Sequence, residues 1–284
     1  MRISSFREPG RLLAVGLATL TLTTAATGLA YPADAPAGEP AIKTSTPRSA
    51  QQITNIDILK QQIRNYYGDP LGTGAIGADG NYARETRSVA AGINRYLSRP
   101  RHVRPGKQKA IVLDIDDTTL ATWNLAVSDN WNNSTAARTD YVDNQKFVAV
   151  PGMVDLVAAA RKQGYAIFYV TNRRASSRAA SLGNLTADGI GVDAGFTAPT
   201  TLPSGEPGLF MRPRPKDYPA YLRTACAADP DATCTTVHLK TAHRTYIESF
   251  GYEIVANIGD QYVDLEGGHG GRTFKLPNPN GYSV

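Results

Sequence analysis

Residues 109–118 read KAIVLDIDDT, a short apolar run that leads directly into a group of acidic side chains. The apolar part is typical of a strand buried on both faces of a parallel sheet. Asp114, Asp116 and Asp117 follow it within four residues. A solvated turn is the alternative, because Asp is common in turns. We favour a functional acidic site, since carboxylates this close together repel one another and a cation relieves that repulsion.

The chain that follows this segment alternates strands with helices, a pattern that predicts an α/β domain with a parallel sheet covered on both faces. We expect strands at 109–114, 166–170, 209–212 and 253–258. We expect helices at 151–164, 176–187, 218–227 and 242–250.

Polar residues gather where these strands end, and ligands of open α/β sheets bind beyond the carboxyl ends of the strands. They come from four separate segments: Asp114 with Asp116, Thr171 with Asn172 and Arg173, Lys240, and Asp260 with Asp264. We place Lys240 just before the helix that leads into the last strand. The sequence therefore predicts one site at one edge of the sheet.

The amino terminus has the pattern of a secretory signal. Residues 1–30 contain arginines, then an apolar run rich in Thr and Ala, then a small-x-small pattern that predicts cleavage near Ala30 and a secreted or extracytoplasmic protein. A membrane anchor is the alternative, but the run is shorter than the roughly 20 apolar residues of a spanning helix. No later segment predicts stable membrane insertion. Residues 31–49, rich in Pro, Ala, Gly and Thr, predict a flexible leader.

Residues 50–100 predict two amphipathic helices, because apolar side chains recur there at spacings of three and four. The apolar positions are Ile53, Ile56, Leu59, Ile63 and Tyr66 in the first, and Tyr82, Val89, Ile93 and Leu97 in the second. We expect both faces to pack on the core domain, residues 107–284. Between them, residues 72–77 read GTGAIG and match a dinucleotide fingerprint formally, but no strand precedes them, so we predict no cofactor site there.

Composition is that of a globular protein: 284 residues, 42% hydrophobic and 19% charged, which fits one α/β domain with extensions. The net charge of +5 comes without a basic stripe, so a nucleic-acid partner is not implied. Cys226 and Cys234 bracket a short polar segment that a disulfide would close as a surface loop; free thiols are the alternative. Two Cys without a nearby pair of His do not make a zinc site.

These motifs together resemble the haloacid dehalogenase (HAD) superfamily, and within it the subfamily IIIB secreted acid phosphatases, which include plant vegetative storage proteins and bacterial class B and class C enzymes. The resemblance covers roughly residues 53–282. It rests on D-x-D-x-T at Asp114, Asp116 and Thr118, the strand that ends at Thr171 before Asn172 and Arg173, Lys240-Thr241-x-x-Arg244, Gly259-Asp260-Gln261 with Asp264-Leu265, and the tail FKLPNP at 274–279. It implies a Rossmann-like three-layer α/β/α domain over 50–284, with an N-terminal helical extension (50–100) and a small cap segment.

The resemblance also implies a mechanism. Asp114 would attack phosphorus and form an aspartyl phosphate, and Asp116 would act as general acid and then as base. Burial and the neighbouring charge are expected to raise the pKa of Asp116. Mg²⁺ would be held by the carboxylates of Asp114 and Asp260 and by the backbone carbonyl of Asp116. Thr171, Asn172 and Lys240 would bind the phosphoryl oxygens.

Several roles stay open at this level. Lys216 competes with Lys240, although a solvated turn is the simpler interpretation of its Pro-flanked segment. Asp264 would orient a metal-bound water, pair with Lys240 or cap a helix, and Arg173 would contact the substrate phosphate or tie down the rim. Asp117 replaces the Glu of many bacterial relatives, and we expect little consequence.

The segment between the first two strands, residues 120–150, is long enough to fold over the site. Trp123, Trp131 and Tyr141 would stack there on an organic leaving group, or simply pack in the core.

The leading hypothesis is a secreted, Mg²⁺-dependent phosphomonoesterase that acts on a small phosphomonoester. A phosphotransferase with the same intermediate is one alternative, and a catalytically weak storage or binding protein is another. The sequence does not predict an oligomeric state.

Overall fold

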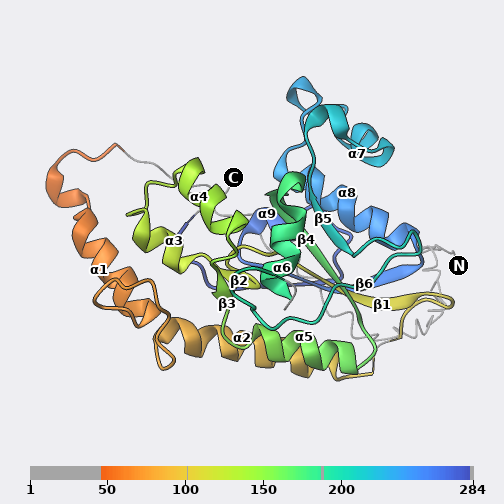
Figure 1. Ribbon diagram of the computed structural model, residues 1–284, viewed down its shortest axis with the longest axis horizontal. Helices are drawn as coiled ribbons and strands as arrows, with labels where there is room; N and C mark the ends of the chain where they lie inside the picture. Colours follow the sequence, from red (N-terminus) through yellow and green to blue (C-terminus); the bar gives the residue numbers. More distant parts are fainter. Residues whose placement is uncertain (1–45, 101, 187–188, 282–284) are drawn as a thin grey trace, which may run out of the picture. The chain divides into compact units, whose positions relative to one another are not determined.

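A parallel five-stranded sheet lies at the centre of the fold (Figure 1). The computed structural model describes residues 46–100, 102–186 and 189–281. Within these residues the strand order is β5-β4-β1-β6-β7, and all neighbours are parallel. The bounds are Gln108–Leu113 (β1), Ala166–Arg174 (β4), Leu209–Arg212 (β5), Tyr252–Gly259 (β6) and Arg272–Lys275 (β7). A separate antiparallel pair joins β2 (Leu120–Ala121) to β3 (Val148–Ala149).

Helices alternate with the strands of this sheet, which confirms the α/β class. Their bounds are Ile56–Tyr67 (α1), Asn81–Leu97 (α2), Trp123–Ser128 (α3), Thr135–Asp143 (α4), Met153–Lys162 (α5), Arg178–Leu185 (α6), Ala220–Ala225 (α7), Thr236–Ser249 (α8) and Tyr262–Leu265 (α9). Short 3₁₀ turns lie at Ala50–Gln52, Ala175–Ser177, Pro215–Asp217 and Pro230–Ala232. In Figure 1, α5 and α2 lie on one side of the sheet and α8 with α7 on the other.

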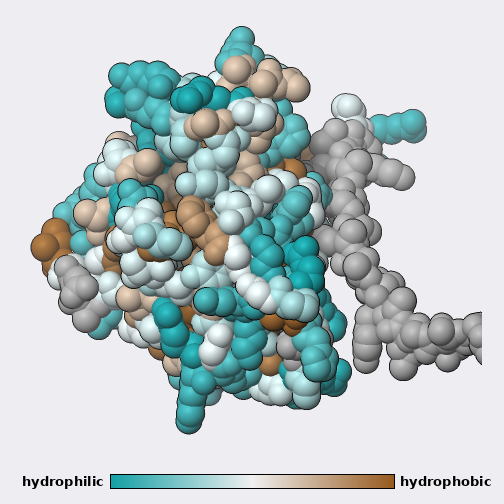
Figure 2. Space-filling view, turned by 90° about the vertical axis from the view of Figure 1, so that its right-hand side faces the viewer, coloured by the Kyte–Doolittle hydropathy of each residue, from teal (hydrophilic) through white to brown (hydrophobic). Residues whose placement is uncertain are grey.

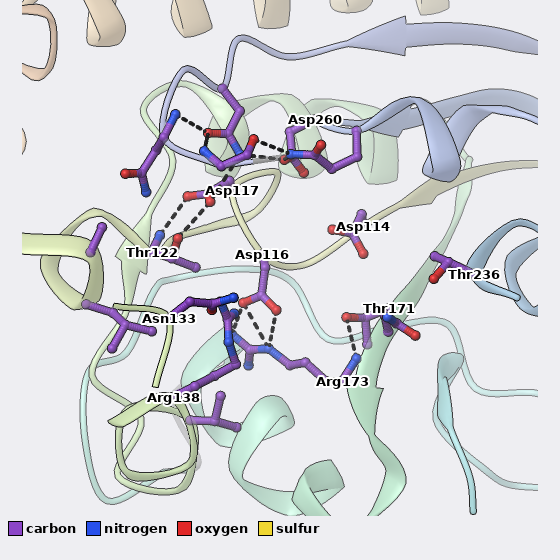
Figure 3. A pocket seen from close by; sticks show the side chains of 18 of the residues that line it. Asp114, Asp116, Asp117, Thr122, Asn133, Arg138, Thr171, Arg173, Thr236 and Asp260 are labelled. Atoms are coloured by element: carbon purple, nitrogen blue, oxygen red, sulfur yellow. Dashed lines mark hydrogen bonds and ion pairs between the residues drawn. The ribbon is translucent and has the colours of Figure 1, made fainter. Parts of the chain in front are cut away.

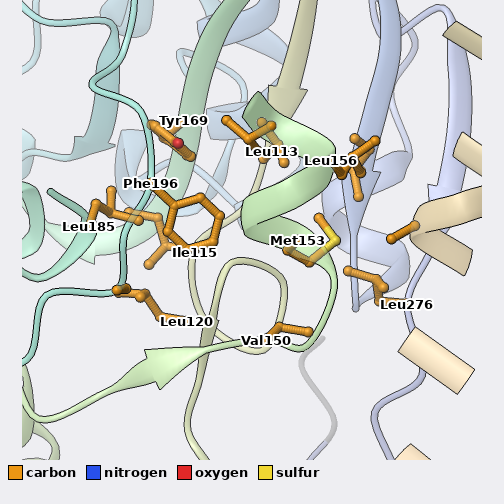
Figure 4. Packing of buried hydrophobic residues seen from close by; sticks show 14 of the residues in the cluster. Leu113, Ile115, Leu120, Val150, Met153, Leu156, Tyr169, Leu185, Phe196 and Leu276 are labelled. Carbon is orange, nitrogen blue, oxygen red and sulfur yellow. The ribbon is translucent and has the colours of Figure 1, made fainter. Parts of the chain in front are cut away.

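The residues of β1 alternate between the two hydrophobic cores that these layers create. Leu113 packs in one core with Met153 and Leu156 of α5, as Figure 4 shows. Val112 packs in the other core with Phe168 of β4 and Ile247 of α8. Because both faces of the strand are buried, its sequence is a continuous apolar run rather than an alternating one.

The strand order decides where the site lies. The chain adds β4 and β5 on one side of β1, then crosses over and adds β6 and β7 on the other side. The direction therefore reverses between β1 and β6, and ligands of doubly wound sheets bind at such a point, beyond the carboxyl ends of the strands. Asp114 follows β1 and Asp260 follows β6, so both acidic residues stand at this reversal.

The N-terminal helices pack on the domain only in part as expected. α2 lies against α5, and Tyr67 at the end of α1 stacks on Tyr82 of α2 with ring centroids 4.3 Å apart. The first turns of α1 differ from the expectation, because Ile56 and Leu59 remain 63% and 44% exposed. The amphipathic pattern of α1 thus has no partner at its amino-terminal end within the described residues.

The loop that resembles a dinucleotide fingerprint binds a carboxylate of its own chain. The backbone N–H groups of Thr73 and Gly74 donate to the Asp69 carboxylate at 2.8 and 2.7 Å. The indole N–H of Trp123 donates to the same carboxylate at 3.0 Å. The backbone donors of this loop are therefore used within the extension instead of facing a phosphate, and the Trp123 bond ties the extension to the core domain.

Two element boundaries correct the sequence expectations. α8 begins at Thr236 rather than at 242, because the Thr235 side chain accepts the His238 N–H and caps the helix. Lys240 consequently lies within α8 and not before it. The tail was expected only as a family motif, but Arg272–Lys275 forms β7 and extends the sheet beside β6.

Cys226 and Cys234 form a disulfide that closes the loop between α7 and α8. The predicted signal, residues 1–30, lies outside the described residues, as does the leader up to residue 45. Among the described helices, none has the length and apolar character needed to cross a bilayer. On the face shown in Figure 2, hydrophobic residues form small separate patches among polar ones.

Candidate active site

A cavity of about 600 Å³ opens at the carboxyl ends of β1, β4 and β6. All four segments singled out in the sequence line it, through Asp114 and Asp116, Thr171 to Arg173, Lys240, and Asp260 with Asp264. Lys216 is exposed in a 3₁₀ turn and does not line the cavity, which leaves Lys240 as the lysine of this site. Figure 3 shows Asp114, Asp116, Thr171 and Asp260 around the open space.

The inner end of the cavity, which we call the floor, is formed by Asp114, Lys240, Asp260 and Asp264. On this floor Lys240 pairs with two carboxylates. Its Nζ lies 2.6 Å from Asp114 Oδ1 and 2.5 Å from Asp264 Oδ1, and all three side chains are at least nine-tenths buried. Burial opposes the charge of Lys240, but the two carboxylates raise its pKa above the ordinary value. Burial raises the pKa of Asp114 to about 7, with Lys240 acting against that rise and Asp264 and Asp116 adding to it.

Asp264 takes two of the roles left open by the sequence. Its Oδ1 pairs with Lys240, and its Oδ2 accepts the Gln261 N–H at 2.9 Å and so caps α9. The backbone passes very close to it: a Cβ at Gly259 would lie 2.4 Å from Asp264 Cβ, so only glycine fits at the end of β6. Buried Arg244 donates to the Asp264 carbonyl at 2.9 Å and holds this turn in place.

Asp260 is held by three neutral donors. Thr118 Oγ1 donates to Oδ1 at 2.9 Å, while Gln261 Nε2 and Asn278 Nδ2 donate to Oδ2 at 2.7 and 2.8 Å. Burial raises the pKa of Asp260, and the neighbouring carboxylates of Asp264, Asp117 and Asp114 raise it further. Asn278 belongs to the C-terminal tail, so the tail motif takes part in shaping the site.

The floor has the donor set of a divalent-cation site. Asp114, Asp260 and Asp264 each offer a carboxylate oxygen, and these oxygens lie within 4.8 Å of one another. Lys240 offsets one of the three negative charges, so a divalent cation would offset the other two. Carboxylate oxygens suit hard cations such as Mg²⁺. The expected pair Asp114 and Asp260 is thus brought together, with Asp264 as a third acidic neighbour.

Asp116 faces a different partner from Asp114. The Arg173 guanidinium donates to it from Nη2 at 2.7 Å and from Nε at 3.1 Å, a bidentate pair visible in Figure 3. Burial favours the neutral acid, but Arg173, assisted by Arg138 and Lys240, lowers the pKa of Asp116 below its ordinary value. This direction is opposite to the expected rise, because the guanidinium of Arg173 reaches Asp116, a contact that no local pattern in the sequence indicates.

Thr171 and Asn172 lie where β4 becomes irregular, between Val170 and Arg174. Irregular strand segments are common beside active sites, since they redirect side chains. Thr171 is buried, and its Oγ1 accepts the Arg173 N–H at 3.2 Å. Asn172 is exposed, and its Oδ1 accepts from the Arg212 guanidinium. Both line the cavity at the position predicted for phosphoryl contacts.

Asp117 shapes the loop after β1. Its backbone is left-handed (φ 54°), a conformation that Asp tolerates better than most residues. The buried carboxylate accepts the Thr122 N–H at 2.8 Å and the Thr122 hydroxyl at 2.7 Å. Asp117 thus ties the start of the cap to the loop after β1. The expectation that Asp in place of Glu has little consequence stays a prediction.

Residues 120–150 form the expected cap, with α3 and α4 between β2 and β3. Trp131 lines the cavity, and its indole N–H donates to Asn280 at 2.7 Å. Trp123 belongs instead to the core, where it stacks on Tyr67 at 4.1 Å. Tyr141 packs beside Phe147 and does not line the cavity. Only Trp131 of the three aromatics is therefore placed to contact a ligand.

The outer wall of the cavity was not predicted from the sequence. α4 turns Thr135, Arg138, Thr139 and Val142 toward the cavity, and Asn133 precedes them. The spacing of three and four puts these residues on one helical face. The only signal in the sequence was that spacing, and it was hidden because the set mixes charged, polar and apolar side chains.

Relatives of known sequence match short stretches of the chain. A stem 28 kDa glycoprotein of Glycine max is 57% identical over 53 residues, 18% of this chain and 20% of that protein. Vegetative storage protein 1 of Arabidopsis thaliana is 51% identical over 45 residues, 16% of this chain and 17% of that protein. The matched stretches thus span about a fifth of these relatives or less.

A solved structure and a family model match far more of the chain. The class C acid phosphatase of Bacillus anthracis superposes with a TM-score of 0.52 over 79% of this chain and 86% of that chain; at 17% identity, this likeness shows the fold. The model of the HAD superfamily, subfamily IIIB (acid phosphatase), matches residues 41–284. Membership supports a phosphatase function, and the resemblance drawn from the motifs is confirmed. The chain belongs to subfamily IIIB of the HAD superfamily, the acid phosphatase subfamily.

Proposed function

We propose that this chain is a secreted, Mg²⁺-dependent phosphomonoesterase that works through an aspartyl phosphate on Asp114. One observation carries the proposal: the buried carboxylate of Asp114 at the end of β1 shares a cavity with Thr171, Lys240 and Asp260 at the point where the strand order reverses. Family membership supports the reaction class and the use of a divalent metal.

Asp114 and Asp260 would hold the cation, with the backbone carbonyl of Asp116 as a further ligand and Asp264 beside them. When bound, the cation supplies charge neutralisation that lets an anionic phosphoryl group approach a carboxylate. Lys240 holds Asp114 at 2.6 Å and limits its rotation. It also offers donors to a phosphoryl oxygen, with Thr171 on the neighbouring strand.

In the first step, Asp114 attacks phosphorus, and the bond to the leaving oxygen breaks. Asp116 gives that oxygen a proton, so the first product is a neutral alcohol or phenol. In the second step, Asp116 takes a proton from water as the water attacks the aspartyl phosphate, which releases phosphate and restores Asp114.

The pair with Arg173 affects how Asp116 obtains its proton. Arg173 keeps Asp116 ionised in the free protein, and the Asp116 side chain is 27% exposed toward the cavity. A phosphomonoester carries one proton below its second pKa near 6. We infer that a monoanionic substrate delivers this proton to Asp116 as Arg173 turns toward the phosphoryl group, which favours activity in acid.

The disulfide and the size of the cavity support two further parts of the proposal, export and a small substrate. The Cys226–Cys234 disulfide fits an oxidising compartment, and relatives named glycoproteins are consistent with an extracellular location. The cavity of about 600 Å³ suits a small molecule rather than a polymer. We therefore propose a small phosphomonoester as substrate.

The test is hydrolysis of para-nitrophenyl phosphate from pH 4 to 8 with Mg²⁺ and with EDTA. We expect activity that EDTA removes and Mg²⁺ restores, and a higher Mg²⁺ requirement in Asp260→Asn. Asp57→Asn, an exposed carboxylate on α1, is the matched control and should keep the wild-type requirement. Folded protein without turnover at any pH would instead favour the storage or binding alternative, and product transfer to added alcohols would favour a phosphotransferase.

A further inference from the structure

We propose that the substrate of this site is a phosphomonoester whose organic part carries its own anionic group, a carboxylate or a second phosphate, and that Arg138 and Arg174 bind this group. The inference rests on the proposed function, because it assumes that the phosphoryl group to be transferred sits on the cavity floor. It adds the chemical class of the leaving group.

Of the described side chains, four basic ones line the cavity, and they form an inner pair, Lys240 and Arg173, and an outer pair, Arg138 and Arg174. Lys240 and Arg173 are buried, and both are already matched by carboxylates at 2.5 to 2.7 Å. Together with the floor cation, they supply the positive charge that a phosphoryl group needs. The inner pair therefore accounts for the chemistry without help from the outer wall.

The outer pair has no such match. Arg138 and Arg174 both line the cavity and both are exposed. Arg138 donates from Nη2 to the neutral side chain of Asn133 at 2.8 Å, and Arg174 has no carboxylate partner in the described part of the chain. Among the described residues neither guanidinium forms an ion pair, although Arg138 attracts Asp116 and Asp117 from farther away. Two guanidinium groups that face a cavity without a paired carboxylate favour an anionic ligand, since planar guanidinium groups bind carboxylate and phosphate in bidentate fashion.

The placement of Arg138 is built into the cap. Asn133 has a left-handed backbone (φ 52°), and Ser134 caps α4 through a bond from the Ala137 N–H. The acidic neighbour in this wall, Asp129, accepts the Ser134 N–H at 2.7 Å and so braces the same turn. The helix then carries Thr135 and Thr139 on either side of Arg138 in the cavity wall. The Thr139 hydroxyl donates to the Thr135 carbonyl at 2.8 Å, so the Thr135 hydroxyl is the one that adds a donor beside the guanidinium.

A neutral aromatic leaving group is the competing ligand, because Trp131, Leu125 and Val142 give the same wall an apolar part. The two ligand classes differ in one measurable respect. An added carboxylate should strengthen binding if the arginines hold the organic part, and should weaken it or leave it unchanged if the apolar residues do.

The experiment compares phenyl phosphate with 3- and 4-carboxyphenyl phosphate. Binding is measured by calorimetry in Asp114→Asn with Mg²⁺, so that turnover is not needed, and hydrolysis is measured in the wild type. We expect at least one carboxylated ester to bind about tenfold more tightly than phenyl phosphate, the strength of a charge-assisted hydrogen bond. Arg138→Gln in the same background should remove most of this advantage, and Arg138→Lys should retain part of it.

Arg95→Gln is the matched control, because Arg95 is an exposed arginine on α2 outside the cavity wall. It removes the same charge and should leave the advantage of the carboxylate unchanged. If phenyl phosphate is hydrolysed but the carboxylated esters bind no more tightly than phenyl phosphate, the inference is overturned while the proposed function stands. Arg138-dependent binding of a carboxylated ester without hydrolysis would overturn the proposed function while the anion subsite stands. If Arg95→Gln and Arg138→Gln lowered the affinity advantage of the carboxylated ester equally, the advantage would come from the net charge of the protein, and the subsite would be refuted.

Discussion

The floor of the cavity and its outer wall both contain basic side chains, but they use them differently. On the floor, Lys240 lies between Asp114 and Asp264, and all three side chains are buried. On the outer wall, Arg138 is exposed, and its one side-chain hydrogen bond among the described residues goes to the neutral Asn133. The lysine of the floor is thus paired with carboxylates of the floor itself, whereas the arginine of the wall forms no ion pair in the part of the chain that the structure describes and is available for a ligand.

The difference follows from the elements that carry each region. The floor is attached to the ends of β1 and β6, which are central strands of the sheet and are packed on both faces. The wall is α4, a nine-residue helix of which only Val142 is buried. We therefore expect substitutions on the floor to change activity and stability together, and substitutions on the wall to change mainly the affinity for different substrates.

The largest effect is expected for Asp114→Asn. The amide keeps the shape of the side chain but cannot act as the nucleophile, so turnover should fall by at least about a thousandfold. Hydrolysis of para-nitrophenyl phosphate gives the loss, and circular dichroism checks that the fold is kept. Residual activity of more than a few per cent would contradict the covalent mechanism.

Lys240→Met should be the most damaging change to stability on the floor. It leaves two buried carboxylates without their shared cation, and breaking a buried pair in this way costs about 3 to 5 kcal/mol. Urea unfolding in EDTA measures the free energy of unfolding. Mg²⁺ should restore part of the loss, because the cation takes over the role of charge balance; no restoration would speak against a metal site at this floor.

The floor also predicts how stability depends on pH without metal. The ordinary pKa of Asp114 is 3.8, and in the folded protein it is raised to about 7. A raised pKa means that the folded state binds the proton more tightly than the unfolded state. The contribution of Asp114 to the free energy of unfolding is therefore fully present below about pH 4 and is lost as the pH rises to about 7.

Melting temperatures from pH 4 to 8 in EDTA test this prediction. Asp114→Asn has no ionising group at this position, so its melting temperature should fall less than that of the wild type as the pH rises. Parallel curves for the two proteins would show that Asp114 does not titrate in this range.

The sequence predicts the floor of the cavity better than its outer wall. β1 and β5 were expected to within one residue, and the residues after β1, β4 and β6 were expected at one edge, because buried parallel strands have a strong apolar signal. The floor was predictable for this reason. Its polar residues follow those strands directly in the chain.

The rest depends on contacts between distant segments. Arg173 reaches Asp116 across 57 positions of the chain, and this contact reverses the expected direction of the Asp116 pKa. Asn278 reaches Asp260 from the tail, and Arg138 faces the cavity from a helix with a weak apolar pattern. None of these contacts has a local signature, because each is decided by how the cap and the tail fold over the sheet.

The disulfide gives a smaller effect that separates stability from chemistry. Replacing Cys226 and Cys234 together by Ser should lower the free energy of unfolding by about 2 to 3 kcal/mol, since the bridge closes a short loop. Neither residue lines the cavity, so turnover of the folded variant should stay close to that of the wild type. Unfolding under oxidising and reducing conditions measures the difference, and equal stability in both would show that the bridge contributes nothing.

The smallest effect is expected for Lys216→Met, the counterpart of Lys240→Met. Lys216 is exposed in the turn Pro215–Asp217 and is absent from the cavity wall, so the change should alter the free energy of unfolding by less than about 0.5 kcal/mol. Activity should also stay within twofold of the wild type. The pair of variants makes the same chemical change at a buried and at an exposed lysine, so it isolates what burial between two carboxylates adds. A strong loss of activity in Lys216→Met would mean that this turn moves onto the substrate during the reaction, and that the charge balance of the floor is completed from outside it.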